Sequence, residues 1–296
     1  MDQISKIKVP FGRKSTEAFI KQVKNASSAE EERSIIANES AKIRNDFGQS
    51  QYDNLKDNLT KLIFIYLLGY PCHFGQMATL QLISKQPFHE KRVGYLAMDL
   101  FLSDNNEILL LTVNSIKNDI RSTNPYFLSF FLICRYVASL PLTFCGNHCN
   151  EPLARDIFPE ILPLYKNDHP YIRKKACLAT IKLIDLVPDL LEDMVRSLPT
   201  LLIDEDHGVF ISAIQLTKET LKLSPEYIVR FRKLVPRLCK RLRSVMAGNG
   251  KSECFVDSVP DPFVQIHLIR LLCFLSENDE EASNQVMEVI SLVFCF

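Results

Sequence analysis

An apolar face of helical period returns along this chain at regular intervals. The first inward-facing residues of successive copies are Val93, Phe127, Ile172 and Val209, with spacings of 34, 45 and 37 residues, and a fifth copy starts at Val264. Repeats of roughly 40 residues built from paired helices are the signature of HEAT and armadillo solenoids. The apolar period is near 3.6 almost throughout, and no run is typical of a strand. We therefore predict an all-α fold, an α-solenoid of HEAT- or armadillo-like helix pairs.

The same pattern places the individual helices. The first is expected to begin near Ser15 or Thr16, and the second follows Ser28. Further helices are expected at about 58–70, 74–85, 90–103, 106–119, 125–141, 151–166, 170–186, 190–203, 208–223, 226–246, 261–276 and 281–294. Two segments are predicted to be insertions between repeats: TFCGNHCN (143–150), and AGNGKSECFVDSVPDP (247–262), which reads as an exposed loop.

The domain organisation follows from where the repeat runs. One trunk domain is expected over residues 15–296, after a flexible N-terminal extension over residues 1–14. The tail, SLVFCF, ends on apolar residues, whereas a complete solenoid covers its last apolar face with a polar cap. We therefore expect the chain to be truncated at its C-terminus, either as the N-terminal part of a longer protein or as a shortened gene model.

Composition excludes several classes of protein. The chain is 47% hydrophobic and carries 35 basic and 35 acidic residues, so it is not typical of a disordered protein and gives no global electrostatic case for nucleic acid. The most apolar stretch, residues 127–142, contains Arg135 and is shorter than the about 20 residues that a membrane span needs. The N-terminus has no apolar signal region, and Cys177, Cys239 and Cys273 lie in apolar helical patterns, as does Cys134. A reducing, cytosolic setting is predicted.

Catalytic and metal-binding motifs are not apparent. Cys145, His148 and Cys149 are the only cluster with metal-like ligands, and no second ligand pair lies at suitable spacing, so we predict no metal site. The segment AGNGKS (247–252) contains Gly-Lys-Ser but lacks the first glycine of a phosphate-binding loop and follows a helix. We expect no cofactor and no enzymatic activity.

Some charged residues have a structural interpretation in a helical repeat. Arg173 occupies a position at which an arginine of one repeat pairs with an aspartate of the next, and Asp168 and Asp204 are the candidates. His169 and His207 stand at equivalent turns between helices, where turn or capping use is the simplest explanation.

A basic run lies between Arg230 and Arg243. It holds seven basic and no acidic residues, with Leu234, Leu238 and Leu242 at four-residue steps. One interpretation is a helix that packs on the core and exposes an ordinary solvated face. The other is a patch for anionic lipid or for an acidic protein surface, where each base contributes about 1 kcal/mol near an anionic membrane.

Ordered motifs carry a resemblance to a known family. They are LLGYPCHFGQMATLQLIS (67–84), KRVGYLAMDLFL (91–102), TVNSIKNDI (112–120), LARDIFPEI (153–161), HPYIRKKACLATIKLIDLVPDLLE (169–192), HGVF (207–210), FRKLVP (231–236) and DPFVQIHLIRLL (261–272). From about residue 15 to 290 the chain resembles the N-terminal trunk of the large subunits of clathrin-type adaptor complexes, and gamma-adaptin most of all. Epsilon-adaptin is similar across fewer motifs, and alpha- and beta-adaptins fit less well.

The resemblance implies a non-enzymatic role in vesicle-mediated protein transport. It implies a heterotetramer with small (sigma), medium (mu) and beta-type adaptor subunits, which sorts transmembrane cargo into clathrin-coated vesicles at the trans-Golgi and endosomes. It also implies recruitment by an Arf-family GTPase and by a phosphoinositide membrane surface. The protein would then be cytoplasmic and peripheral on those membranes, the Golgi apparatus included. The alternatives are an epsilon-type subunit of a non-clathrin coat, or a generic HEAT-repeat scaffold such as a transport receptor or phosphatase subunit.

The resemblance also implies site residues. In the family a basic residue of the first helices helps to bind acidic dileucine cargo signals, and this position falls on Lys24, near Lys21; the family usually has arginine there. The stretch that meets phosphoinositide in related subunits is LKDNLTK (55–61), which offers Lys56 and Lys61. From the basic run, Arg237, Lys240 and Arg241 are the residues expected to face phosphoinositide or the GTPase.

Overall fold

The structure is a computed structural model, and it describes residues 11–48, 54–102, 107–122, 131–248, 252–257 and 259–293. The chain divides into two compact units, Met1–Asn150 and Glu151–Phe296. Both are built from helices that pack on helices close to them in the sequence. The predicted all-α solenoid is therefore confirmed, since paired helices and short connections account for nearly all the described chain.

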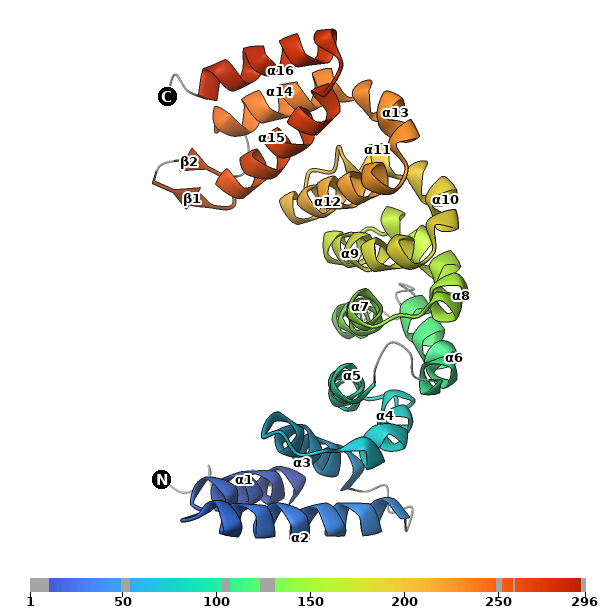
Figure 1. Ribbon diagram of the computed structural model, residues 1–296, viewed down its shortest axis with the longest axis vertical. Coiled ribbons are helices and arrows are strands. Elements are labelled where there is room, and N and C mark those ends of the chain that lie inside the picture. Colours follow the sequence, from blue (N-terminus) through green and yellow to red (C-terminus); the bar gives the residue numbers. More distant parts are fainter. Residues whose placement is uncertain are drawn as a thin grey trace. The chain divides into compact units, whose positions relative to one another are not determined.

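The N-terminal unit consists of helices in its described part (Figure 1). They are α1 (Phe11–Lys24), α2 (Ala29–Gly48), α3 (Leu55–Leu67), the short 3-10 helix η2 (His73–Gly75), α4 (Gln76–Ile83), α5 (Phe88–Phe101), α6 (Ile108–Arg121) and α7 (Phe131–Asn147). Helices α3, α5 and α7 contact one another in that order, while α4 packs on α5 and α6 packs on α7.

The C-terminal unit repeats this arrangement and adds one hairpin. Its elements are α8 (Glu151–Ile161), η3 (Leu162–Lys166), α9 (Pro170–Leu186), η4 (Pro188–Leu190), α10 (Leu191–Val195), α11 (Leu198–Leu201), α12 (His207–Leu223), η5 (Pro225–Tyr227), α13 (Ile228–Arg232), α14 (Val235–Met246), β1 (Phe255–Val256), β2 (Val259–Pro260), α15 (Pro262–Ser276) and α16 (Glu280–Val293). Figure 1 shows α9, α12 and α15 as successive members of one layer, and each contacts the next.

Burial follows the predicted helical faces. Ile172, Val209 and Val264, which begin three of the predicted apolar faces, are at most 2% exposed. Each lies in the first turn of its helix and is followed at helical spacing by further buried side chains, because residues three and four apart share one face. Val93 is partly buried against the core of the N-terminal unit. Phe127 lies outside the described residues.

One glycine sets the distance between two helices. Gly94 of α5 lies against the C-terminal end of α4, and a Cβ atom added there would fall 2.8 Å from Ile83 Cγ2 and 3.0 Å from the Ile83 main-chain nitrogen. Glycine is therefore needed for this approach, although it weakens a helix interior by about 1 kcal/mol relative to alanine.

The segment 143–150 is not an insertion, and that prediction is wrong. Residues as far as Asn147 continue α7, and Phe144, Cys145 and Cys149 are at most 2% exposed. The apolar side chains of this segment fit a helix end that packs on α5, where Phe144 lies 6.5 Å from the Tyr95 ring. Residues 131–147 and 151–161, which lie within the longer spacing of 45 residues, are therefore helical.

Other boundaries also differ from the prediction. The helices expected at 190–203 and 226–246 are broken before Pro199 and Pro236, which stand in the first turns of α11 and α14. Proline has no N–H for the previous turn, so a helix restarts there rather than running through. The segment 247–262 is not wholly a loop, because β1 and β2 pair in an antiparallel hairpin.

The N-terminal boundary lies earlier than expected. Helix α1 begins at Phe11, ahead of the predicted start at Ser15, and residues 1–10 of the predicted extension lie outside the described residues. Among the described helices, none combines the length and the apolarity that crossing a membrane requires.

Candidate functional site

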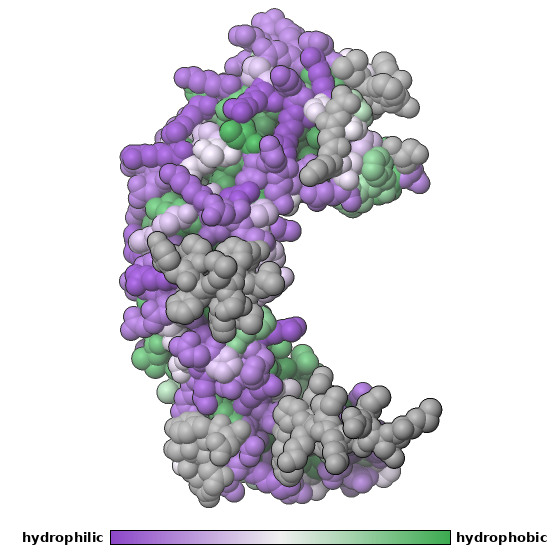
Figure 2. Space-filling view, turned by 180° about the vertical axis from the view of Figure 1, so that it is seen from behind, coloured by the Kyte–Doolittle hydropathy of each residue, from purple (hydrophilic) through white to green (hydrophobic). Residues whose placement is uncertain are grey.

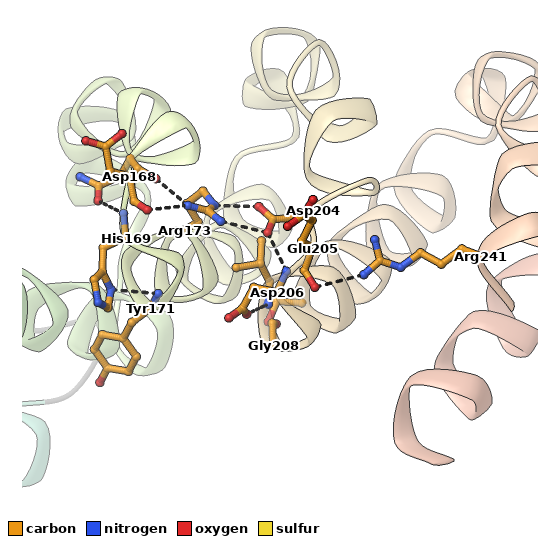
Figure 3. Close-up of polar contacts among 12 residues, drawn as sticks. Asp168, His169, Tyr171, Arg173, Asp204, Glu205, Asp206, Gly208 and Arg241 are labelled. Carbon is orange, nitrogen blue, oxygen red and sulfur yellow. Dashed lines mark hydrogen bonds and ion pairs between the residues drawn. The ribbon is translucent and has the colours of Figure 1, made fainter. Parts of the chain in front are cut away.

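Arg173 links the first turn of α9 to the turn before α12 (Figure 3). Its Nε and Nη2 donate to the two carboxylate oxygens of Asp204, at 2.7 and 2.9 Å. Its Nη1 donates to the main-chain carbonyls of Asn167 and Asp168. A planar guanidinium fits a carboxylate in this bidentate way. The predicted pairing with an aspartate of the next repeat is confirmed for Asp204, while Asp168 contributes its carbonyl.

The two histidines at the turns play different parts. The Nδ1 of His169 accepts the N–H of Tyr171 at the start of α9, which confirms capping use. At α12 the capping residue is Asp206, so His207 is the first helical residue instead. The Nδ1 of His207 is buried without a hydrogen bond, 3.5 Å from Oδ1 of Asp261. His207 therefore contacts the segment after α14.

The face of α14 that carries Leu238 and Leu242 is buried, as the four-residue spacing predicts. Two bases of the run also serve the fold. Arg232 donates to main-chain carbonyls at the end of α15 and lies 3.5 Å from Asp279. Arg243 pairs with Glu288 of α16 at 2.6 Å. These two side chains hold α13 and α14 to their neighbours.

Arg241 is held in place from both sides. Its guanidinium lies 4.1 Å from the centroid of the Phe210 ring. It also donates to the main-chain carbonyl of Glu205 at 3.4 Å (Figure 3). Burial lowers the pKa of Arg241, and the nearby charges of Asp204 and Glu205 oppose that shift. Arginine stays protonated in spite of such a shift, so a fixed cation lies at this place.

The four other bases of the run are exposed and, within the described part of the chain, have neither a hydrogen bond nor an ion pair. They are Arg230, Lys233, Arg237 and Lys240. Two of them, Arg237 and Lys240, line an open cleft of about 720 Å³ together with Arg241 and His207. The structure thus brings together the three bases that sequence reasoning selected in this region.

Asp261 closes one side of this cleft. It is 5% exposed, has a left-handed backbone (φ 45°), and its Oδ1 accepts the N–H groups of Glu253 and Cys254 at 2.9 and 3.0 Å. Burial raises the pKa of this carboxyl, but hydrogen bonds from Ser252, Cys254 and Glu253 and the charge of His207 outweigh it, so the pKa lies below its usual range. Asp261 thereby fixes the segment that carries the hairpin.

The predicted cargo residues lie together on α1. Lys21 and Lys24 are exposed, one turn apart, while Phe19 and Val23 of the same helix are buried. Phe19 packs edge to face on Phe64 of α3, with ring centroids 6.0 Å apart. The helix is thus held by its apolar side and presents both lysines to solvent.

Lys56 and Lys61 lie on α3 but differ in environment. Lys61 pairs with Glu39 of α2 at 2.6 Å, and the two side chains are only 8% and 15% exposed. Its charge is therefore already compensated inside the N-terminal unit. Lys56 is half-buried in the first turn of α3. Of this pair, only Lys56 keeps a charge that an external anion could reach without breaking an ion pair.

The buried trio of Lys91, Tyr95 and Asp119 was not found from the sequence. Lys91 Nζ donates to Asp119 Oδ1 at 2.7 Å and to the carbonyl of Ile83, and the Tyr95 hydroxyl donates to Asp119 Oδ2 at 2.9 Å. Burial raises the pKa of Asp119, and Lys91 and Tyr95 act against that shift. Lys91, the lysine of the KRVGYL motif, therefore stabilises the fold. Its spacing of four residues from Tyr95, which places both on one helix face, is the sequence feature from which the trio could have been predicted.

The cysteine and histidine cluster lies at and just after the end of α7. Cys145 and Cys149 are buried, and burial raises the pKa of the Cys145 thiol well above its usual value. His148 instead lies 3.4 Å from Asp99 of α5. Within the described ranges, no group of three or more potential ligands is arranged to hold a metal ion.

Comparisons with known proteins place these features in a family. Residues 32–293 match the family model described as the adaptin N terminal region. The chain is 37% identical to AP-1 complex subunit gamma of Dictyostelium discoideum and 38% identical to AP-1 complex subunit gamma-1 of Arabidopsis thaliana; each match covers 93% of this chain and 30% of the relative. The chain therefore spans less than a third of the length of these relatives.

A solved-structure comparison agrees on the fold. A homology model of the full-length AP-3 complex in an intermediate open conformation matches 81% of this chain and 38% of its own chain, with a TM-score of 0.60 and 23% sequence identity. The family match extends from α2 to the end of α16 and so includes the Arg173 contact and the basic cleft. The chain belongs to the adaptin N-terminal region family.

Proposed function

We propose that this chain is the large-subunit trunk of a heterotetrameric vesicle-coat adaptor that sorts transmembrane cargo into clathrin-coated vesicles at the trans-Golgi and endosomes. The observation that carries the proposal is the adaptin match over residues 32–293, together with relatives named as gamma subunits of AP-1 complexes. The protein acts by binding rather than by catalysis, and its partners are small (sigma), medium (mu) and beta-type subunits.

The bases that solvent can reach are assigned to the anionic partners of such a complex. Lys21 and Lys24 contact the acidic part of a dileucine cargo signal, because α1 presents both charges to solvent on a helix held by its apolar side. Lys56, Arg237, Lys240 and Arg241 face a phosphoinositide membrane surface or an Arf-family GTPase. A lysine binds a carboxylate as a point charge rather than through a bidentate fork, so cargo affinity at Lys24 is modest.

Assembly is the first test of this proposal. We would co-express the full chain with the small subunit of a gamma-type adaptor and measure complex formation by size exclusion. A stable one-to-one complex is expected. A helical protein that never takes up the small subunit would overturn the adaptor assignment.

Cargo binding is tested on the assembled complex with a labelled acidic dileucine peptide. Lys24→Glu is expected to weaken peptide binding about fivefold or more, since a charge reversal removes an attraction and adds a repulsion. Lys233→Glu is the matched control, because Lys233 is an exposed base without a partner in the described structure and lies outside α1. Equal binding by the Lys24 variant and the wild type would remove Lys24 from the cargo site while leaving the assembly result intact.

A further inference from the structure

The cleft at α14 has features of a site for clustered phosphates. Arg237, Lys240, Arg241 and Ser244 follow one another at helical spacing and share one face of α14. The cleft of about 720 Å³ that they line is bounded on other sides by His207 and by parts of the segment after α14. This volume falls in the range of about 300–1,000 Å³ that is usual for small-ligand sites.

Two of the three bases in the cleft, Arg237 and Lys240, make no hydrogen bond or ion pair within the described part of the chain. Arg232 pairs with Asp279 in the turn between α15 and α16, and Arg243 pairs with Glu288 of α16. Arg237 and Lys240 have no ion-pair partner in the part of the chain that the structure describes. Two uncompensated cations within one helical turn repel each other. An anion bound between them relieves that repulsion.

Arg241 adds a cation whose orientation is already set. It lies against the Phe210 ring and donates to the Glu205 carbonyl, so little side-chain freedom remains to be lost on binding. Partial burial reduces the water around it, which strengthens its interaction with an incoming charge. Arginine forks also match the geometry of phosphate oxygens.

The two acidic groups of the cleft leave this positive charge in excess. Asp261 is engaged by the N–H groups of Glu253 and Cys254 and lies beside His207. Glu205 is the other carboxylate of the lining. Three arginine and lysine side chains therefore stand against two carboxylates, one of which is turned to its own chain.

The hairpin beside the cleft favours a membrane as the source of the phosphates. Residues 252 and 261 line the cleft, and between them β1 and β2 expose Phe255, Val256 and Val259, with 65%, 46% and 43% of their surfaces accessible. Figure 1 shows this hairpin projecting beyond the start of α15. Exposed apolar side chains next to a basic site are what binding at a membrane interface needs.

We propose that this cleft binds the headgroup of a phosphoinositide while the β1–β2 hairpin inserts its apolar side chains among the lipids. The proposal deepens the proposed function, since it rests on the membrane role of Arg237, Lys240 and Arg241 and selects a lipid headgroup over a GTPase surface for them. A protein partner would need a patch of about 800 Å² per side, and a compact basic cleft suits a small anion better.

Vesicle binding by the full chain tests the site. We would measure co-sedimentation with phosphatidylcholine vesicles that contain a phosphoinositide, and with phosphatidylserine vesicles of the same net charge. Arg237→Ala/Lys240→Ala is expected to weaken binding to phosphoinositide vesicles about tenfold or more. The control Arg230→Ala/Lys233→Ala removes two exposed bases of the same run that do not line the cleft and is expected to change binding less than about twofold.

A hairpin variant separates the two parts of the site. Phe255→Ser/Val256→Ser is expected to lose vesicle binding but to keep binding of soluble inositol trisphosphate, measured by calorimetry. Equal losses from the cleft and control pairs, or equal binding to both kinds of vesicle, would overturn the site. If the wild-type protein bound soluble inositol trisphosphate but neither kind of vesicle, the lipid assignment would be overturned.

Assembly with the small subunit tests the proposed function separately from lipid binding. Each variant is also co-expressed with the small subunit, and normal complex formation is expected because none of these side chains is buried in the described fold. Failure of vesicle binding with intact assembly would therefore count against the cleft alone.

Discussion

The guanidinium of Arg173 bonds both carboxylate oxygens of Asp204, across a separation of 31 residues in the sequence. The two side chains are 17% and 12% exposed, and the same guanidinium binds two carbonyls of the turn before α9. One side chain thus fixes the start of α9 against the turn that leads into α12. This contact connects consecutive repeats through polar groups, in addition to their apolar faces.

Replacing Arg173 is expected to destabilise the protein. Arg173→Ala leaves the partly buried carboxylate of Asp204 without its cation, although the Asp206 N–H still donates to it, and the expected cost is about 3 kcal/mol. Arg173→Lys keeps the charge but loses the fork, so a smaller loss is expected. Thermal unfolding followed by circular dichroism measures both. In a double-mutant cycle with Asp204→Asn, the stability lost by the double variant should be smaller than the sum of the losses of the two single variants. Strict additivity would show that the pair is not coupled.

The buried trio in the N-terminal unit predicts a rescue. Lys91→Met leaves the Asp119 carboxylate buried beside Tyr95 without its cation, at a cost of about 3–5 kcal/mol. Adding Asp119→Leu removes the stranded charge, and the double variant should recover a large part of the lost stability. The measurement is the melting temperature of Lys91→Met and of the double variant. A double variant less stable than Lys91→Met would contradict this account.

Gly94→Ala tests the close approach of α4 and α5. In an open helix this change stabilises by about 1 kcal/mol. Here the new Cβ would meet main-chain and side-chain atoms of Ile83 within 3.0 Å, so a lower melting temperature is expected. Gly48→Ala is the control, since nothing lies within 4 Å of a Cβ there. A Gly94 variant as stable as the control would show that α4 moves away at little cost.

Thiol reactivity should follow burial. Burial raises the pKa of Cys72 to about 11 and that of Cys177 to about 12, so both remain protonated thiols at neutral pH. Cys273 is exposed. Iodoacetamide labelling of the native protein at pH 7.5, followed by peptide mass spectrometry, should modify Cys273 first and Cys177 only after denaturation. Early modification of Cys177 would mean that α9 opens readily.

The contribution of Asp261 to the stability of the fold should fall as the pH is lowered. Its pKa is lowered in the folded protein relative to the ordinary 3.8, so its hydrogen bonds stabilise the fold above that value and lose their effect as the pH falls through the folded pKa. Asp261→Asn should therefore lower the melting temperature at pH 7, and the difference from wild type should shrink below about pH 4. A difference that stays constant down to pH 3 would exclude the carboxylate as its cause.

The sequence alone is enough to predict the repeat architecture and the contact between Arg173 and Asp204, because both depend on residues that recur at a fixed period. Ile172, Val209 and Val264 are buried where the apolar pattern places them, and Arg173 meets Asp204 because each repeat sets its first turn against the next. Proline alone would not have placed the helix breaks, because Pro199 and Pro236 stand in the first turns of new helices whereas Pro141 lies inside α7.

The cleft and the ion pairs could not be derived in the same way. In the sequence, Lys61 and Arg237 are both single bases within an amphipathic helical pattern. In the structure, Lys61 pairs with Glu39, whereas Arg237 lines a cleft. What distinguishes them is the position of other helices, which a local pattern does not contain. The cleft combines the turn between α11 and α12, the start of α12, α14 and the hairpin segment, and only packing brings these together.

The layered packing of each unit also affects how chaperones and proteases would recognise a damaged molecule of this protein. In the C-terminal unit α9 contacts α12, and α12 contacts α15, so each helix relies mainly on its immediate neighbours. A lesion that loosens α15 and α16 bares the apolar surface of those helices while α8 and α9 keep their own contacts. Chaperones and proteases, which bind exposed apolar segments, would then meet a partly opened chain rather than a fully unfolded one.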